Sequence, residues 1–197
     1  NGALYMDFID PHDIYDKVIV IDAGHGSRMS GATKNGIQEK DINLDIVLQL
    51  KALFDAYDGN IGVYYTRTDD SNPTLQQRAE LANKAGADLF ISVHNNSSGT
   101  GNFTSVNGTQ VLYSESDDRG LGSKKLAQIC LDNVTAATGS NDFGLLKADD
   151  IYIVRSSEAP VALIEVGFMT NRDELAKLAD PEYQKTAAQG IFNAVLE

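Results

Sequence analysis

Four side chains able to bind a metal or move a proton stand beside short apolar runs of the chain. His25 and His94 each follow a β-rich run directly, Glu165 lies near the end of a third, and Glu39 comes shortly after His25. Two imidazoles and one carboxylate form a common catalytic zinc set that leaves a fourth position for water, and a further carboxylate can act as base. These residue types indicate metal-assisted hydrolysis.

Each of these residues also has an ordinary structural interpretation. A lone histidine after a strand is more often a hydrogen-bonded structural residue than a ligand, and Glu165 could form a strand-end salt bridge. Glu165 is the most informative, because a carboxylate between Ile164 and Val166 is costly to bury without a partner. The glycines on both sides of His25 remove side-chain bulk, so a metal could approach closely.

The elements that must position these residues alternate between strand and helix. β-rich runs predict six strands, at Val18–Asp22, Ile61–Thr66, Leu89–Val93, Gln110–Tyr113, Ile151–Val154 and Val161–Val166. Helical periodicity predicts helices from near Lys40 and over Leu75–Lys84, Gly120–Ala137 and Pro181–Leu196. The alternation predicts a single α/β domain with a mostly parallel mixed sheet of about six strands, flanked by helices on both faces.

Three of these strands precede or contain His25, His94 and Glu165. If these strands are parallel neighbours, their carboxyl ends share one edge of the sheet, where open α/β folds bind ligands. The polar stretch Asn95–Asn107 follows a strand directly and is predicted to be the longest loop and a wall of a substrate groove. The sequence therefore predicts one site at this edge.

Composition narrows the function further. The 197 residues are 42% hydrophobic, enough for one core, with residues 1–16 expected to be an N-terminal extension or linker remnant and 17–197 the domain. A formal charge of −12 argues against nucleic acid as a partner, and no apolar run is long enough for membrane insertion. We expect that this chain contains no signal region and that the protein is a monomer. We also expect Cys130 to be buried and unreactive.

An ordered series of motifs carries a family resemblance over most of the chain. The motifs are Val20–Gly26, Gly36 with Glu39–Leu44, Thr66–Asp69, Leu75 with Arg78 and Ala82–Asn83, Ala87–His94 and Glu165–Asn171. In these motifs the chain resembles the catalytic domain of the zinc-dependent, third family of N-acetylmuramoyl-L-alanine amidases, from about residue 17 to the C-terminus.

This resemblance implies an autolysin-type hydrolase that cuts the amide bond between the lactyl group of N-acetylmuramic acid and L-alanine in peptidoglycan. It implies one Zn²⁺ per chain with His25, Glu39 and His94 as metal ligands, and Glu165 as the catalytic residue. The partner would be a glycan strand carrying a stem peptide, and the location extracellular or in the cell wall or periplasm. The stretch between His94 and Glu165 looks too short for the inserted blocking helix of some relatives, so an open groove is expected.

Three other functions fit parts of the same pattern. A zinc peptidase cutting within the stem peptide would use the same ligands, a non-haem iron oxygenase also uses two histidines and a carboxylate, and a wall-binding module could keep the fold without activity.

Of the remaining polar residues, Arg67 and Arg78 are predicted to pair with Asp69, Asp70 or Glu80 more readily than with substrate. Asn43 is predicted to support the local backbone.

Overall fold

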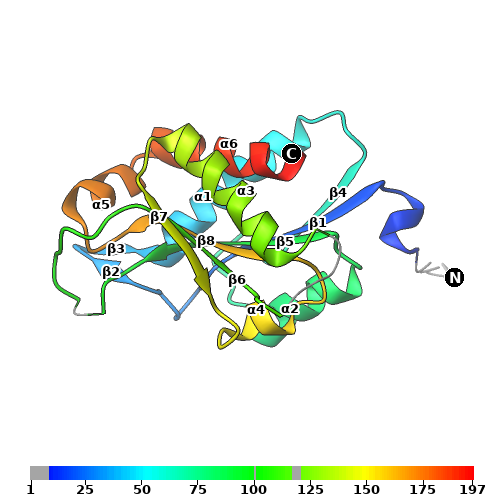
Figure 1. The fold of residues 1–197 in the computed structure, drawn as a ribbon, viewed down its shortest axis with the longest axis horizontal. Helices are drawn as coiled ribbons and strands as arrows, with labels where there is room; N and C mark the ends of the chain where they lie inside the picture. The colour runs from blue at the N-terminus through cyan, green and yellow to red at the C-terminus, as the bar shows by residue number, and fades with distance from the viewer. Residues whose placement is uncertain (1–8, 100, 117–120) are drawn as a thin grey trace, which may run out of the picture.

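The structure, a computed structural model, describes residues 9–99, 101–116 and 121–197 and contains one α/β domain (Figure 1). Its main sheet has six strands in the order β4-β1-β5-β8-β6-β7. In chain order these are β1 (Lys17–Ala23), β4 (Ile61–Tyr65), β5 (Leu89–Asn96), β6 (Thr109–Tyr113), β7 (Asp142–Lys147) and β8 (Val161–Phe168). The strands β2 (Thr33–Lys34) and β3 (Ile37–Gln38) form a separate antiparallel pair.

The pairing of the strands matches the predicted mixed sheet. β1 pairs in parallel with β4 and with β5, and β5 pairs in parallel with β8. β6 runs antiparallel to β8 and parallel to β7. The carboxyl ends of β1, β5 and β8 therefore lie side by side at one edge of the sheet, as the sequence predicts.

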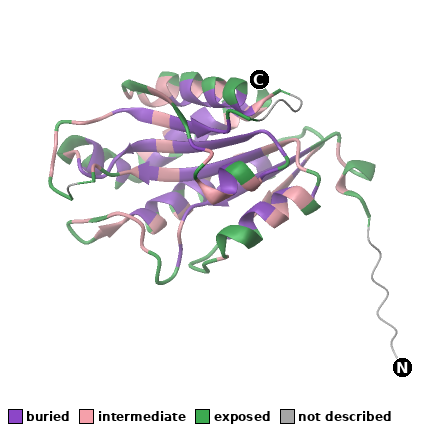
Figure 2. Ribbon diagram, turned by 60° about the horizontal axis from the view of Figure 1, so that its bottom comes forward, coloured by how far each residue is buried: buried purple, intermediate pink, exposed green. Residues whose placement is uncertain are grey.

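Helices cover both faces of this sheet (Figure 1). One face carries α1 (Glu39–Asp55), α3 (Ser123–Thr138) and α6 (Pro181–Leu196), and the other carries α2 (Leu75–Lys84) and α4 (Tyr152–Ser156). β1 shows why two layers are needed, since Ile19 and Ile21 pack towards the first layer and Val18 and Val20 towards the second. Figure 2 shows the strands as the buried middle of the molecule.

Several elements differ from the sequence prediction, among them the short strands β2 and β3, which were not predicted. The run Ile151–Val154, predicted to be a strand, begins the short helix α4, because an apolar run of four residues carries no periodicity that separates strand from helix. β7 was not predicted: it is an exposed edge strand interrupted by Gly144 at a φ of 97°. The helix α5 (Arg172–Leu178) was also missed, and α3 begins at Ser123, whereas the predicted start at Gly120 lies outside the described residues.

The N-terminal segment makes contacts with the domain where it is described. Residues 1–8 of the predicted extension lie outside the described residues, and the short 3-10 helix η1 (Pro11–Asp13) comes just before β1. His12 Nε2 lies 3.1 Å from Asp88 Oδ2, and Tyr15 packs against the core. The domain start at residue 17 stays a prediction. Within the described ranges, no helix has both the length and the apolarity that crossing a membrane requires.

Candidate metal centre

The site is built from the ends of three neighbouring strands and the start of one helix. His25 lies two residues after the end of β1, His94 lies two residues before the end of β5, and Glu165 lies within β8. His94 and Glu165 are direct partners in the β5–β8 register. Glu39 is the first residue of α1, which the β2–β3 hairpin leads into, so the fold returns it to the strand end that carries His25.

Three of the four predicted site residues meet at one point. Glu39 Oε1 lies 3.0 Å from His25 Nε2 and 3.0 Å from His94 Nδ1. The two imidazole rings stand edge to face with their centroids 4.9 Å apart. The candidate ligand atoms of His25, Glu39 and His94 all lie within 4.8 Å of one another. The sequence therefore identified residues that the fold brings together across 69 positions of chain.

The carboxylate of Glu39 is held in place by the surrounding backbone. Its Oε2 accepts a hydrogen bond from the Ala32 N–H at 2.8 Å, and its Oε1 accepts one from the Asn95 N–H at 3.2 Å. Burial alone would raise the pKa of Glu39, but the hydrogen bonds and charges of the two imidazoles outweigh it and hold the pKa well below its ordinary value. Glu39 is therefore an anion fixed at the centre of the site.

Glycine is required where the chain passes close to the ligands. A Cβ on Gly24 would lie 2.3 Å from His94 Nε2, and one on Gly31 would lie 2.3 Å from Glu39 Oε2. His25 itself has a φ of 62°, a left-handed conformation that side chains other than glycine rarely adopt. This turn gives the imidazole of His25 the direction that brings its Nε2 to Glu39.

The donor set fits a divalent metal of the zinc type. Ligands about 2.0 Å from a tetrahedral ion stand about 3.3 Å apart, and the two nitrogen-to-Oε1 distances of 3.0 Å are close to that spacing. Imidazole nitrogens and a carboxylate oxygen suit zinc and other late transition metals better than magnesium or calcium, which prefer oxygen ligands. The three residues could therefore hold a metal ion without a large rearrangement.

Glu165 lies next to this group without a partner of its own. Among the described residues, nothing donates a hydrogen bond to its buried Oε2. Burial raises the pKa of Glu165 to about 7, His94 opposes the rise and the negative charge of Glu39 adds to it. Within residues 9–99, 101–116 and 121–197, Glu165 forms no strand-end salt bridge, which was its ordinary interpretation, and its carboxyl group can both accept and release a proton near neutral pH.

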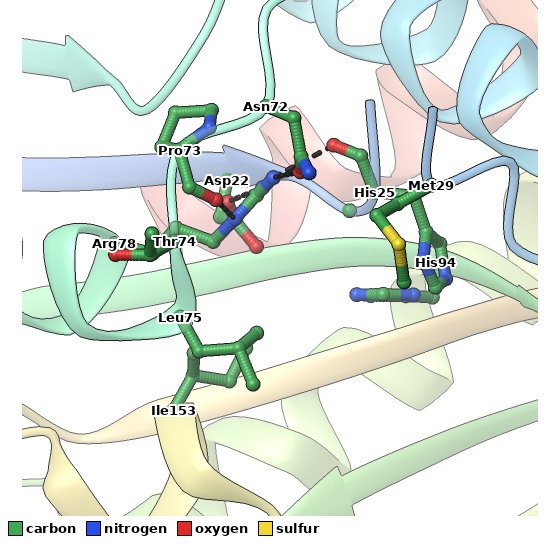
Figure 3. A pocket seen from close by; sticks show the side chains of 11 residues that line it. Asp22, His25, Met29, Asn72, Pro73, Thr74, Leu75, Arg78, His94 and Ile153 are labelled. Carbon is green, nitrogen blue, oxygen red and sulfur yellow. Dashed lines mark hydrogen bonds and ion pairs between the residues drawn. The ribbon is translucent and has the colours of Figure 1, made fainter. Parts of the chain in front are cut away.

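A hollow of about 310 Å³ opens beside the two histidines (Figure 3). Its walls include His25 and His94 but not Glu165, together with Met29, Ile153 and the residues that lead into α2, namely Asn72, Pro73, Thr74 and Leu75. The hollow gives the histidine edge of the site access to solvent, and its apolar walls can accommodate part of an organic substrate.

The neighbouring polar residues differ from the sequence prediction. Arg78 pairs with Asp22 at 2.6 Å, and the hydrogen bonds that the structure gives for Arg67 all go to backbone carbonyls, so neither forms the expected bridge to Asp69, Asp70 or Glu80. Asn43 supports the backbone as predicted, since its Nδ2 donates to Gly24 O at 3.1 Å and also lies 3.4 Å from Glu39 Oε1. Asn95 is buried against Asn43, where the sequence suggested a groove wall.

The contacts of the arginines with carbonyls could not be predicted from the sequence, because a backbone carbonyl has the same chemistry at every position. For Arg78 the one available signal was Asp22, a carboxylate at the end of the apolar run 18–21, which needs a buried cation as its partner. Such a partner could be found only once the fold was known.

Comparison with known proteins identifies a family with which the chain shares most of its length. The family model described as N-acetylmuramoyl-L-alanine amidase matches residues 19–197. The protein YqiI of Bacillus subtilis is 37% identical over 182 residues, which cover 92% of this chain and 84% of YqiI. The N-acetylmuramoyl-L-alanine amidase LytC of the same organism is 34% identical over 93% of this chain, which spans only 36% of LytC.

Solved structures of amidases have the same fold. The catalytic domain of CwlV, from Bacillus (Paenibacillus) polymyxa var. colistinus, superimposes with a TM-score of 0.82 at 35% identity, covering 91% of this chain and 96% of that domain. An N-acetylmuramoyl-L-alanine amidase from Clostridium difficile 630 gives a TM-score of 0.84 at 33% identity and covers 91% of this chain and 95% of that one. The chain belongs to the N-acetylmuramoyl-L-alanine amidase family of peptidoglycan hydrolases.

Proposed function

We propose that this chain hydrolyses the amide bond between the lactyl group of N-acetylmuramic acid and L-alanine, with one Zn²⁺ held by His25, Glu39 and His94 and with Glu165 as the catalytic base. The observation that carries the proposal is the meeting of three ligand atoms within 4.8 Å beside a carboxyl group that has a free, buried oxygen. Family membership supports the amidase reaction, and the donor set supports zinc.

Zinc bound at these residues would supply Lewis acidity, which polarises the scissile carbonyl and makes water easier to deprotonate. Glu165 would take a proton from the attacking water onto its carboxylate while the water oxygen bonds to the lactyl carbonyl carbon. The same carboxyl group would then give that proton to the departing nitrogen of L-alanine as the carbon–nitrogen bond breaks. Burial of Glu165 makes its protonated form more favourable than it is in water, so the carboxyl group can hold the proton between the two transfers.

The remaining residues in the site would act by holding this arrangement. The Ala32 and Asn95 N–H groups fix both oxygens of Glu39, and Asn43 ties the same carboxylate to the carbonyl of Gly24. Partners of this kind orient metal ligands and restrict them to one geometry. The helices between His94 and Glu165 pack on the sheet layers, α3 against α6 and α4 against α2, which supports the expectation of an open groove in the described part of the chain.

The setting of this reaction follows from its substrate. Peptidoglycan as partner implies action outside the cytoplasm, at the cell wall, and we propose that location for the protein that contains this domain. A net charge of −12 opposes general adsorption to anionic wall polymers, so recognition would depend on local contacts at the site edge.

The first test is mass-spectrometric analysis of purified peptidoglycan after digestion by this chain, with and without chelator, and again after zinc is restored. We expect intact stem peptides with a new L-alanine amino terminus, loss of the reaction with chelator, and its recovery with zinc. Cuts inside the stem peptide would instead identify a peptidase. The absence of any product from a zinc-loaded chain would contradict a catalytic role.

A further inference from the structure

The turn that carries His25 is held by an unusual set of donors. The carbonyl oxygens of three consecutive residues, Ala23, Gly24 and His25, each accept a hydrogen bond from an arginine side chain. Ala23 O accepts two, from Arg67 Nε at 2.8 Å and from Arg78 Nη1 at 2.7 Å. These carbonyls lie at and just beyond the end of β1, and the guanidinium groups supply hydrogen-bond donors to them there.

Arg67 joins this turn to the helix that carries Glu39. Its Nη2 donates to Gly24 O at 2.9 Å and to Lys40 O at 2.8 Å, so one nitrogen connects the strand-end turn with the residue that follows Glu39. Its Nη1 donates to Asp69 O at 2.9 Å. The planar guanidinium therefore fixes the separation of the two chain segments that present His25 Nε2 and Glu39 Oε1 to each other.

Arg78 holds the same turn from the opposite helical layer. Its Nη2 donates to His25 O at 2.7 Å, and its Nη1 contacts Asp22 Oδ1 at 2.6 Å (Figure 3). Asp22 is in turn fixed by the hydroxyls of Thr66 and Ser92, each at 2.6 Å from one of its oxygens. Arg78 is thus locked to β1, β5 and the segment after β4 before it reaches His25.

Burying both arginines carries an electrostatic cost, and Asp22 is the buried carboxylate that pairs with one of them. Arg67 is 3% exposed and Arg78 is 2% exposed, so both cations are almost completely buried. Burial and the neighbouring Arg78 charge lower the pKa of Arg67. Two buried positive charges near a cation site also oppose metal binding by Coulomb repulsion, which Asp22 offsets only in part. Charge alone therefore predicts that removing an arginine strengthens metal binding.

We propose that Arg67 and Arg78 are positioning residues that hold the turn 23–25 so that His25 meets Glu39, and that they thereby set the metal affinity of the site. The inference rests on the proposed metal ligands but not on the identity of the substrate. The positioning role requires the planar guanidinium group, because a single ammonium group cannot donate hydrogen bonds to two or three carbonyls in one plane. Lysine at either position would keep the charge and lose the function.

The test measures metal binding and folding separately in Arg67→Lys and Arg78→Lys. Zinc affinity is determined by chelator competition, the ligand geometry by the visible absorption of the Co²⁺ form, and the stability of the metal-free chain by urea unfolding. We expect at least about tenfold weaker zinc binding in each variant, the usual effect of losing a residue that orients metal ligands, and an altered Co²⁺ spectrum.

Gln184→Met provides the matched control. Gln184 is a buried side chain of α6 that donates to Leu178 O at 2.9 Å and also bonds Asp45 of α1, so its loss removes a buried side-chain-to-carbonyl bond without touching the turn 23–25 or the three candidate ligands. We expect this variant to lose stability while keeping wild-type zinc affinity and Co²⁺ spectrum. If a lysine variant does not fold, Thr66→Val replaces it, since it removes a hydroxyl that fixes Asp22 under Arg78, and about threefold weaker zinc binding is expected from the weaker restraint.

The possible outcomes distinguish the positioning role of the two arginines from the proposed set of metal ligands. Wild-type or tighter zinc binding in the folded variants would overturn the positioning role while leaving the metal site intact. Failure of the wild-type chain itself to bind zinc would overturn the proposed ligand set instead. A loss of zinc affinity in Gln184→Met as large as in the lysine variants would also overturn the positioning role, because general destabilisation would then explain the effect.

Discussion

Glu39 Oε1 lies 3.0 Å from one ring nitrogen of each histidine and accepts a hydrogen bond from the Asn95 N–H. A carboxylate in that position contacts both histidines at distances close to the spacing of two ligands on one metal ion. The contacts within the protein therefore hold the three candidate ligand atoms in one group.

Replacement of Glu165 by glutamine should separate catalysis from metal binding. The amide cannot take a proton from water at neutral pH, so we expect turnover to fall by about 10² to 10⁴-fold. Because Glu165 is not among the three converging ligands, zinc affinity should stay near that of the wild type. Turnover is measured by release of stem peptides from peptidoglycan, and bound zinc by metal analysis of the same preparation. Near-normal turnover with zinc bound would remove Glu165 from the mechanism.

At this scale the sequence predicted residue types better than their contacts. The family resemblance implied His25, Glu39 and His94 as ligands, whereas the residue types and positions alone indicated only a metal or catalytic site among them. The partners of Arg67 and Arg78 could not be predicted, because a guanidinium is satisfied equally well by the nearby carboxylates of Asp69 or Asp70 and by carbonyls at positions 23–25. The buried position of both arginines decides between these partners, and burial is a property of the fold.

At the scale of elements, the helix α5 depends on the residue that precedes it. The side chain of Asn171 accepts hydrogen bonds from the N–H groups of Asp173 at 3.0 Å and Glu174 at 3.1 Å. This cap also orients Glu174, whose carboxylate accepts from the N–H groups of Gly108 and Phe168. A helix of seven residues has little stability of its own, so the cap and these contacts fix it beside β8.

We therefore expect Asn171→Ala to lower the free energy of unfolding by about 1 kcal/mol, as is typical for the loss of such a cap. Urea unfolding of the metal-free chain measures it. Asn171→Ser is the control, since serine accepts the same hydrogen bonds and should keep most of the stability. Equal losses in the two variants would show that the capping interaction is not the cause.

Elements with a long periodic pattern were the ones that could be predicted. The predicted bounds of α2 and α6 coincide with the observed ones. Thr74 caps the start of α2, Pro181 begins α6, and apolar residues repeat at helical spacing along both helices. The errors fall on short elements. Ile153 and Val154 are buried in a single helical turn against α2, and β7 has a polar start and a glycine, so local composition does not distinguish either one from its alternatives.

At the scale of the whole molecule, the ligands come from three separate segments that only the complete sheet brings together. Zinc at 100 times its dissociation constant should then stabilise the fold by about 2.7 kcal/mol, which corresponds to a rise in Tm of about 5–10 °C for a domain of this size. Thermal unfolding in chelator and in zinc measures the shift.

His25→Asn is the matched variant for this measurement. Asparagine tolerates the left-handed backbone at residue 25 but has no imidazole, so the metal-free Tm should change little and the zinc-dependent rise should disappear. A zinc-dependent rise that persists in this variant would place the ion at other residues.

The reversed direction of β6 determines how freely the edge of the site can change during evolution. Because β6 runs antiparallel to β8, it starts at the same edge at which β5 ends, and residues 97–108 connect the two without crossing the molecule. A parallel β6 would have required a crossover to the far edge, usually through a helix. Insertions or deletions in the exposed part of this connection would therefore alter the surface beside His94 and Glu165 while leaving the strand register unchanged. Amidases of this fold can in this way differ in the surface that they present beside the site.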